Sequence, residues 1–322
     1  MNYDIFNGDA DGIIALLQLR LANPIESELV TGVKRDIDLL TKLTRNVKLV
    51  KGDKLTILDI SMKKNQAGLM KALNDGISVF YADHHITGEI PVSKHLSAHI
   101  DLDANICTAL IVDKLLNRKY HHWAITAAYG DNLIGVADNL SKVAGLTLEQ
   151  ARFLNELGTL INYNGYGSDI TDLHYHPAEL FAELLKYESP FDVIAESNSP
   201  FYKLQDAYQT DMTQVESISP MYQADKLFII ELPDEDWSRR ISGVYCNALA
   251  NKNPHAAHVV LTKNNDGLSY TVSLRAPLSN KFGAGDICSQ FDTGGGRAAA
   301  AGINTLPIDK IQQLINVIEA TY

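Results

Sequence analysis

An apolar run leads directly into one acid and two imidazoles in the stretch Gly76-Ile77-Ser78-Val79-Phe80-Tyr81-Ala82-Asp83-His84-His85. The run before Asp83 predicts a buried strand, which places Asp83, His84 and His85 at its carboxyl end. Open α/β sheets bind their ligands at that end of their strands. One carboxylate and two imidazoles there indicate a divalent-metal site; the alternative is a structural acid beside two surface histidines.

Two earlier apolar runs also end in acids. Tyr3–Asn7 is a predicted strand, and the turn Gly8-Asp9-Ala10-Asp11-Gly12 leads from it into a buried helix, Ile13–Leu21. Lys54–Asp59 is another predicted strand, and a helix, Lys63–Leu73, follows it. The alternative for the first of these acidic turns is a solvated Asp-Gly turn.

Strands that alternate with helices predict a doubly wound, mostly parallel sheet, whose strands all have their carboxyl ends along one edge. Acids that are far apart in the sequence therefore meet at that edge. The side chains expected to converge there are those of Asp9, Asp11, Asp59, Asp83, His84 and His85. Asp131 comes after a predicted helix, His122–Tyr129, and is a further candidate ligand; the alternative is a helix-terminal acid.

The remaining elements fit an α/β chain of two domains. In the first part we expect a strand at Glu28–Val33, helices at Asp36–Leu43, Ala104–Leu116, Leu146–Leu160 and Pro177–Leu185, and a loop at Asn162–Ser168. A helix at Ser199–Glu216 would join the domains. The expected boundaries are a first domain at 1–198, a linker helix at 199–225 and a second, smaller α/β domain at 226–322.

The second domain has a different pattern. Two predicted strands, Ala256–Thr262 and Leu268–Leu274, flank a polar Asn-Asn-Asp-Gly turn, which predicts an antiparallel hairpin. Gly294-Gly295-Gly296-Arg297 predicts a tight glycine-rich turn. The other elements expected here are a strand at Leu227–Leu232 and helices at Ile241–Ala250 and Pro307–Ala320.

Composition narrows the classes of partner. The 322 residues are 46% hydrophobic and 21% charged, with a formal net charge of −11, which is typical of a soluble globular protein. Phosphate contacts to a long nucleic-acid duplex need a basic surface, so such a duplex is excluded as a partner, whereas a small anionic substrate could bind through metal ions.

Localisation is predicted from what the sequence lacks. The start of the chain has no basic, apolar leader, and no apolar run approaches the roughly 18 residues needed to cross a bilayer. We therefore expect no membrane contact. The three cysteines, Cys107, Cys246 and Cys288, form neither a zinc pattern nor a disulfide framework, which indicates free thiols in the cytoplasm.

The motifs, in this order, resemble those of the DHH phosphoesterase superfamily, in its DHH–DHHA1 branch, over nearly the whole chain. Asp83-His84-His85 is similar to the signature that gives the superfamily its name. The motifs that resemble the others are Gly8–Gly12, in the style of RecJ-like and oligoribonuclease-like members, Leu58-Asp59, Gly130-Asp131, Val272–Arg275 and Gly294–Gly302.

The resemblance implies a hydrolase with two divalent cations, Mn²⁺ or Mg²⁺, and a substrate cleft between its domains. Asp9 would bind the first cation, Asp59 both, and Asp11, His84 and Asp131 the second, with an intervening water as the nucleophile. His85 would contact the scissile phosphate, so the catalytic residues would be His85 and Asp59. The residues implied for binding the far end of the substrate are Arg275, Gly294, Gly295, Gly296 and Arg297.

Two positions depart from the superfamily pattern. Many relatives have a histidine ahead of the first acidic pair, as a ligand of the first metal, where this sequence has Asn7. The glycine-rich motif usually continues with histidine, where this sequence has Arg297. Arginine keeps a phosphate-binding donor but is not a proton shuttle at neutral pH.

The function expected on these grounds is metal-dependent hydrolysis of short oligonucleotides or small nucleotides to mononucleotides. Two alternatives stay open: a phosphatase or exopolyphosphatase on a smaller phosphate, and a degenerate, non-catalytic binding or scaffold protein. The sequence does not choose among RNA, DNA, cyclic dinucleotides and phosphorylated adenosines as substrates, and it leaves open whether the chain forms a homodimer.

Overall fold

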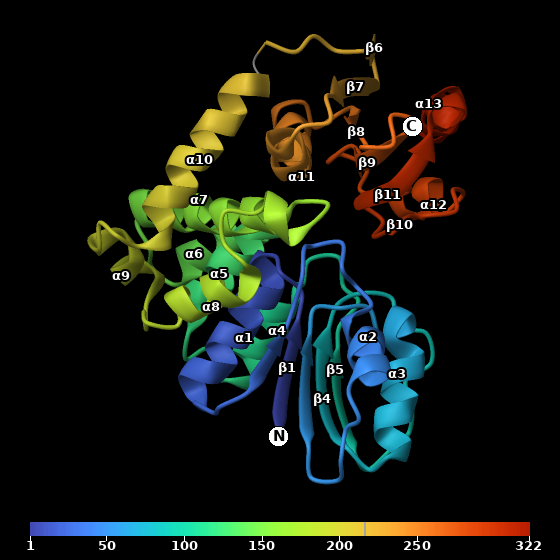
Figure 1. Ribbon diagram of the computed structural model, residues 1–322. Helices are drawn as coiled ribbons and strands as arrows, with labels where there is room; N and C mark the ends of the chain where they lie inside the picture. The colour runs from blue at the N-terminus through green and yellow to red at the C-terminus, as the bar shows by residue number, and fades with distance from the viewer. Residues whose placement is uncertain (216) are drawn as a thin grey trace. The chain divides into compact units, whose positions relative to one another are not determined.

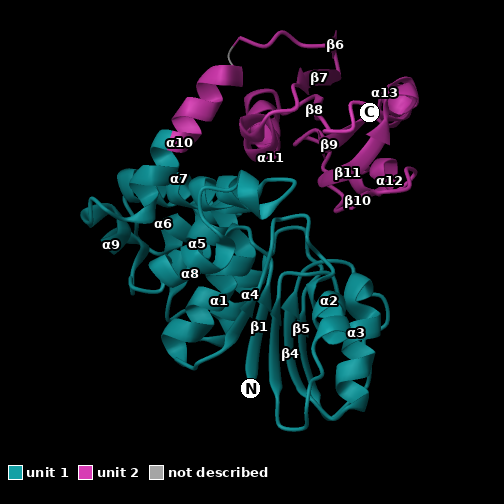
Figure 2. Cartoon of the chain, in the orientation of Figure 1, with its two compact units in different colours: residues 1–206 teal, residues 207–322 magenta. Residues whose placement is uncertain are grey.

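The computed structural model describes residues 1–215 and 217–322 and divides them into two compact units (Figure 2). Unit 1 is Met1–Asp206 and unit 2 is Ala207–Tyr322. The division falls within helix α10, Pro200–Val215. Glu216, the last residue of the predicted joining helix, lies outside the described residues.

Unit 1 is built on one five-stranded sheet with the strand order β2-β1-β3-β4-β5. All neighbouring strands are parallel, so the predicted doubly wound α/β sheet is confirmed. The chain changes direction across the sheet between β1 and β3, and doubly wound sheets bind ligands at such a switch point. The strands are β1 Asn2–Phe6, β2 Glu28–Val30, β3 Lys54–Leu58, β4 Ser78–Asp83 and β5 Leu96–Ile100.

Helices cover both faces of this sheet (Figure 1). Helices α1, Ala10–Ala22, and α4, Thr108–Leu115, lie on one face, and α2, Leu39–Asn46, and α3, Met62–Asn74, lie on the other. Helix α1 is buried almost all round, because further helices pack on its outer side. Those that follow are α5 His121–Gly130, α6 Ile134–Val143, α7 Leu148–Gly165, α8 Pro177–Leu184 and α9 Pro190–Ala195, with a 3₁₀ turn at Ile170–Asp172.

Several elements of unit 1 differ from expectation. Strand β5 and helices α6 and α9 were not predicted. The segment Asn162–Ser168, expected as a loop, begins inside α7, which continues to Gly165. Asn162 and Asn164 are buried, and the side chain of Asn164 pairs with both the N–H and the carbonyl of Tyr175, at 3.0 and 2.9 Å. Tertiary hydrogen bonds therefore override the loop-like composition of the segment.

Unit 2 contains a six-stranded sheet with the order β10-β11-β9-β8-β7-β6. The predicted hairpin is confirmed, because β8 and β9 are antiparallel neighbours. Apolar residues of the sheet, α12 and α13 share one core. The strands are β6 Tyr222–Ala224, β7 Leu227–Leu232, β8 Ala257–Lys263, β9 Ser269–Arg275, β10 Gly294–Gly296 and β11 Ala300–Pro307; the helices are α11 Asp236–Lys252, α12 Ala284–Cys288 and α13 Ile311–Thr321, with a 3₁₀ turn at Ile308–Lys310.

One expectation about this unit is wrong. Gly294–Gly296 is not a turn but an edge strand, β10, which pairs antiparallel with β11. Side chains would not fit at two of its positions: a Cβ on Gly294 would lie 1.8 Å from the Cys288 carbonyl oxygen, and one on Gly296 would lie 2.4 Å from Ala301 Cα. The glycines therefore allow the strand to lie close to α12 and β11.

Among the described residues, no helix has the length and apolar character needed to span a membrane.

Candidate active site

Three neighbouring strands of unit 1 deliver acids to one edge of the sheet. Asp9 follows β1, Asp59 follows β3 and Asp83 ends β4, and these strands are adjacent in the order β1-β3-β4. Asp11 lies in the first turn of α1, directly beyond β1. The structure thus brings together side chains that are up to about 75 residues apart in the sequence, as carboxyl ends of parallel strands do.

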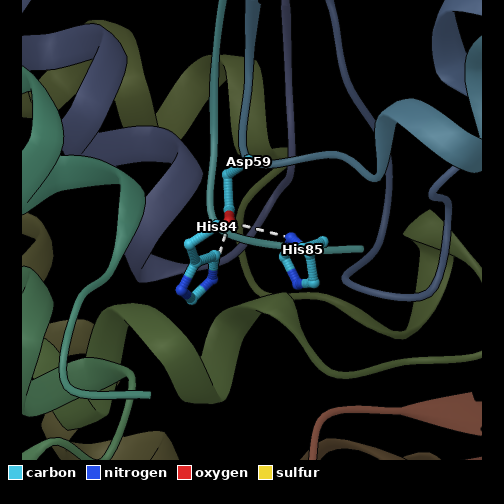
Figure 3. Close-up of side chains that lie close together, drawn as sticks. All are labelled: Asp59, His84 and His85. Carbon is cyan, nitrogen blue, oxygen red and sulfur yellow. Dashed lines mark ion pairs between the residues drawn. The ribbon is translucent and has the colours of Figure 1, made fainter. Parts of the chain in front are cut away.

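The Asp59 carboxylate lies between the two histidine rings (Figure 3). Its Oδ1 is 3.3 Å from His84 Nε2 and 3.7 Å from His85 Nδ1, and it accepts a hydrogen bond of 3.1 Å from Thr108 Oγ1. The potential ligand atoms of Asp59, His84 and His85 all lie within 4.8 Å of one another. This is the spacing of side chains that can bind a single metal ion.

The orientation of His84 is fixed by a backbone carbonyl. His84 Nδ1 lies 2.7 Å from the carbonyl oxygen of Ile106, which can only accept, so Nδ1 carries the proton. In the neutral ring, Nε2 then keeps its lone pair, and it faces Asp59 and Asp11, whose Oδ2 is 3.6 Å away. Metal-binding histidines are commonly held in this way through their second nitrogen.

His85 is held by a different acid. Its Nδ1 donates to Asp83 Oδ1 at 2.7 Å, and Asp83 is completely buried. The His85 side chain is 31% exposed, whereas that of His84 is only 3% exposed. His85 therefore combines a fixed ring with access from outside, as a residue that contacts a substrate requires.

Asp11 is held by the start of a helix. Its two carboxylate oxygens accept the backbone N–H groups of Thr108 and Ala109, both at 2.7 Å, at the N-terminus of α4. Burial, followed by the nearby charge of Asp59, raises the pKa of Asp11 well above its ordinary value. Burial and the charge of Asp9 raise the pKa of Asp59 in the same way. Crowded, buried carboxylates of this kind gain from a bound cation.

Asp9 already has a cation beside it. Its Oδ2 pairs with the ammonium of Lys34, which also donates to Asn162 Oδ1 at 3.1 Å. Burial alone would raise the pKa of Asp9, but the charge of Lys34 lowers it below its ordinary value. Burial alone would lower the pKa of Lys34, but the charges of Asp9, Tyr166 and Asp131 and the hydrogen bond to Asp9 together raise it.

Asn7 is committed to the backbone around this ion pair. Its Nδ2 donates to the carbonyl of Lys34, and its Oδ1 accepts the N–H of Asp9, both at 3.2 Å. Asn7 is 3% exposed. Asn7 thus stabilises the Lys34 segment.

Asp131 also belongs to this group. It follows α5 as its C-cap, and its charge raises the pKa of Asp9, Asp11 and Asp59, which places it within electrostatic reach of all three. A Cβ on Gly130 would lie 2.6 Å from Ala10 Cβ, so glycine permits the close approach of α5 to α1.

The donor set fits one divalent cation of the Mn²⁺ or Mg²⁺ class. Carboxylates with one or two imidazoles suit such ions better than they suit thiolate-binding metals. The carboxylate oxygens of Asp11 and Asp59 accept hydrogen bonds, yet each keeps a further lone pair. A first cation at Asp9 fits less well, because Lys34 and backbone amides use that carboxylate.

Comparison with known proteins relates both units to one group. The family model of the DHHA1 domain matches residues 224–322. The structure of exonuclease RecJ bound to manganese is similar at a TM-score of 0.60 and 15% identity, covering 99% of this chain and 89% of that one. RecJ from Thermus thermophilus in complex with Mn²⁺ gives a TM-score of 0.56 and 14% identity, covering 99% and 51%. The pGpG-specific phosphodiesterase PggH from Vibrio cholerae gives 0.52 and 13%, covering 100% and 98%. No curated protein sequence matches the chain.

At these identities the solved structures establish the fold. The same chain has a DHHA1 domain, this fold and an Asp-His-His sequence at the end of β4. Residues 224–322 thus match a DHHA1 domain, and the chain has the fold of the RecJ structures. The DHHA1 match covers most of unit 2.

The DHHA1 domain contains the residues expected at the far end of the substrate. Arg275, at the end of β9, is 9% exposed, and its guanidinium donates to Asn247 Oδ1 at 2.5 Å and to the carbonyls of Leu274 and Gly243 at 3.0 and 3.3 Å. It therefore ties α11 to the sheet. Arg297 lies at the tip of the β10–β11 hairpin, where its N–H donates to the Ala300 carbonyl at 2.8 Å.

Sequence reasoning missed Lys34 and Asn162, which complete the surroundings of Asp9. Lys34-Arg35 resembles an ordinary solvated basic pair, and Asn162 belonged to the presumed loop. The one available signal was the missing histidine at position 7, which implied a different partner for Asp9.

Proposed function

We propose that the chain is a metal-dependent phosphodiesterase that cuts short oligonucleotides or small nucleotides to mononucleotides. The observation that carries this proposal is the convergence of Asp11, Asp59 and His84 beside the more exposed His85. The RecJ fold, known from structures bound to manganese, and that of a pGpG-specific phosphodiesterase support the same reaction class.

In this proposal Asp11, Asp59, His84 and Asp131 hold a divalent cation, Mn²⁺ or Mg²⁺. When bound, such an ion polarises phosphoryl oxygens and lowers the pKa of a water molecule. Thr108 orients Asp59, and the N-terminus of α4 orients Asp11, so both carboxylates are positioned before any ion arrives.

His85 contacts the scissile phosphate in this account. Asp83 accepts a hydrogen bond from the Nδ1 of His85, which fixes the ring and leaves Nε2 directed away from that acid. A protonated imidazole at this place would donate to a phosphate oxygen. The backbone of β4 delivers both His84 and His85, so the metal ligand and the substrate contact are only one residue apart.

The far end of the substrate is assigned to the DHHA1 domain. Gly295 lies on the edge strand β10 and has open space where a side chain would be, so its backbone is accessible to a ligand. Together with Gly294, Gly296 and the guanidinium of Arg297 it would bind a second phosphate. Arg275 would support this binding site through its hydrogen bond to the Gly243 carbonyl of α11.

A hydrolysis panel tests the function. Purified chain with Mn²⁺ would be offered pGpG, RNA and DNA of about two to five units, cyclic dinucleotides, phosphorylated adenosines, polyphosphate and long single strands. Release of mononucleotides from the short linear substrates is expected. Activity on phosphomonoesters or polyphosphate alone would support the phosphatase alternative, and binding without turnover of any substrate would support a scaffold.

We assign this activity to a reducing compartment, the cytoplasm. Cys107, Cys246 and Cys288 are all buried and form no disulfide among the described residues, which supports that assignment.

A further inference from the structure

We propose that the Lys34 ammonium takes the place of the first of the two cations, so that the DHH unit binds one divalent ion instead of two. This inference rests on the proposed function and deepens it. It concerns the residues around Asp9, where the chain departs from the pattern that implies two ions.

Both oxygens of the Asp9 carboxylate already have partners within the protein. Its Oδ1 is the N-cap of α1 and accepts the N–H groups of Asp11 and Gly12, at 3.0 and 3.1 Å. Its Oδ2 pairs with Lys34. A divalent ion at Asp9 would therefore have to displace a buried ion pair, and breaking such a pair leaves an uncompensated charge.

Asn7 does not replace the missing ligand. Its amide oxygen accepts the N–H of Asp9 and its amide nitrogen donates to the carbonyl of Lys34. Both polar atoms thus point at backbone groups. Asn7 and Lys34 are therefore structurally coupled, since Asn7 fixes the segment that carries Lys34.

Lys34 is anchored more firmly than a surface lysine. Its N–H donates to the Gly165 carbonyl at the end of α7, at 2.8 Å, so hydrogen bonds fix its backbone on both sides. Its side chain is 24% exposed, its ammonium donates to Asn162, and it lies 5.3 Å from the centroid of the Tyr166 ring. The C-terminal end of α7 and Asn7 therefore hold the charge beside Asp9.

An ammonium group can replace part of what a divalent metal ion does at such a site. It supplies a compact positive charge and three N–H donors. Asp9 and Asn162 take two of these donors. The third can donate to a phosphate oxygen, which would make Lys34 a substrate-binding residue of the same site.

Metal stoichiometry tests the inference without relying on activity. The full chain would be dialysed against Mn²⁺, its metal content measured by plasma mass spectrometry, and its electron paramagnetic resonance spectrum recorded. We expect about one Mn²⁺ per chain and the spectrum of an isolated ion. About two ions with an exchange-coupled spectrum would overturn the inference but leave the proposed function intact. A chain that binds no Mn²⁺ would overturn both.

Variants connect the stoichiometry to Lys34. The double variant Lys34→Met/Asn7→His removes the ammonium and restores an imidazole, so it should bind about two Mn²⁺ ions. Lys34→Arg, which keeps the charge, should still bind one, and so should the control Lys42→Ala, which removes an exposed lysine of α2. If the double variant folds, as judged by circular dichroism, and still binds one ion, then Lys34 is not what excludes the second.

Discussion

Asp59 is the residue on which the site depends most, and its backbone is strained. Its φ of 58° lies in the left-handed region, which costs a residue other than glycine about 1–2 kcal/mol. The N–H of Asp59 donates to the Ala82 carbonyl at 3.1 Å, which holds this conformation against β4. The strain turns the carboxylate towards His84 and His85 instead of continuing β3.

The metal-free chain should lose stability as the pH rises. The pKa values of Asp11 and Asp59 are raised in the folded state, so their contribution is present at low pH and is lost as the pH rises through those values. Asp59→Asn cannot ionise and tolerates the left-handed backbone. In EDTA at pH 8 the free energy of unfolding of this variant should therefore exceed that of the wild type, by about 1.4 kcal/mol for each unit by which the pKa is raised, and its melting temperature should be higher. This advantage should shrink towards pH 5.

The control for that experiment is Asp75→Asn, which removes an exposed carboxylate after α3. Its melting temperature should follow that of the wild type across the same pH range. If Asp59→Asn were less stable than the wild type at every pH in EDTA, the crowding of carboxylates would not be a cost of the metal-free fold.

Among the secondary-structure elements, the sequence predicted the strands that are buried on both faces of the sheet. Strands β1, β3 and β4 are mostly apolar, and their ends placed the acids correctly at one edge. Strand β5 was missed because it is a half-exposed edge strand with Ser97 and His99 among its residues. Lys34 could not be predicted as part of the site, since only its tertiary contacts with Asp9 and Asn162 distinguish it from a solvated lysine.

The edge strand β10 offers a matched pair of substitutions. The Cβ of Gly295→Ala meets open space, so the free energy of unfolding should be unchanged or raised by about 0.4–1 kcal/mol. The melting temperature should then be equal to that of the wild type or slightly higher. Gly294→Ala would place its Cβ 1.8 Å from the Cys288 carbonyl oxygen and should destabilise unit 2. If the backbone at Gly295 approaches the substrate, its variant should raise KM for a dinucleotide several-fold. An unchanged KM would remove β10 from the binding site.

Arg275 should matter for folding as well as for substrate. Arg275→Ala removes the hydrogen bonds that the guanidinium donates to Asn247 Oδ1 and to the Gly243 carbonyl. The free energy of unfolding should fall by about 1–3 kcal/mol. Thermal melting would measure this loss. Arg297→Ala, at the hairpin tip, should raise KM with a smaller loss of stability. Equal stability of wild type and Arg275→Ala would contradict the structural role.

At the scale of the whole molecule, charge limits the substrate. A chain with a net charge of −11 offers long strands few favourable contacts outside the site. We expect oligonucleotides of about two to five units to be cut faster than long strands, with a weaker salt dependence than that of a protein making many phosphate contacts. Initial rates on a length series at two salt concentrations would measure both. Equal rates on long single strands and dinucleotides would contradict the expected preference for short substrates.

Hydrolysis of a simple aryl phosphodiester tests the metal site by itself, because this substrate needs the metal site but has no second phosphate. Wild type should be active with Mn²⁺ and inactive in excess EDTA. Asp59→Asn should lower kcat/KM by about 100-fold or more, equivalent to about 2.7 kcal/mol, while Asp75→Asn stays at the wild-type level. Full activity in EDTA, or near-normal activity of Asp59→Asn with Mn²⁺, would contradict a metal-dependent site centred on Asp59.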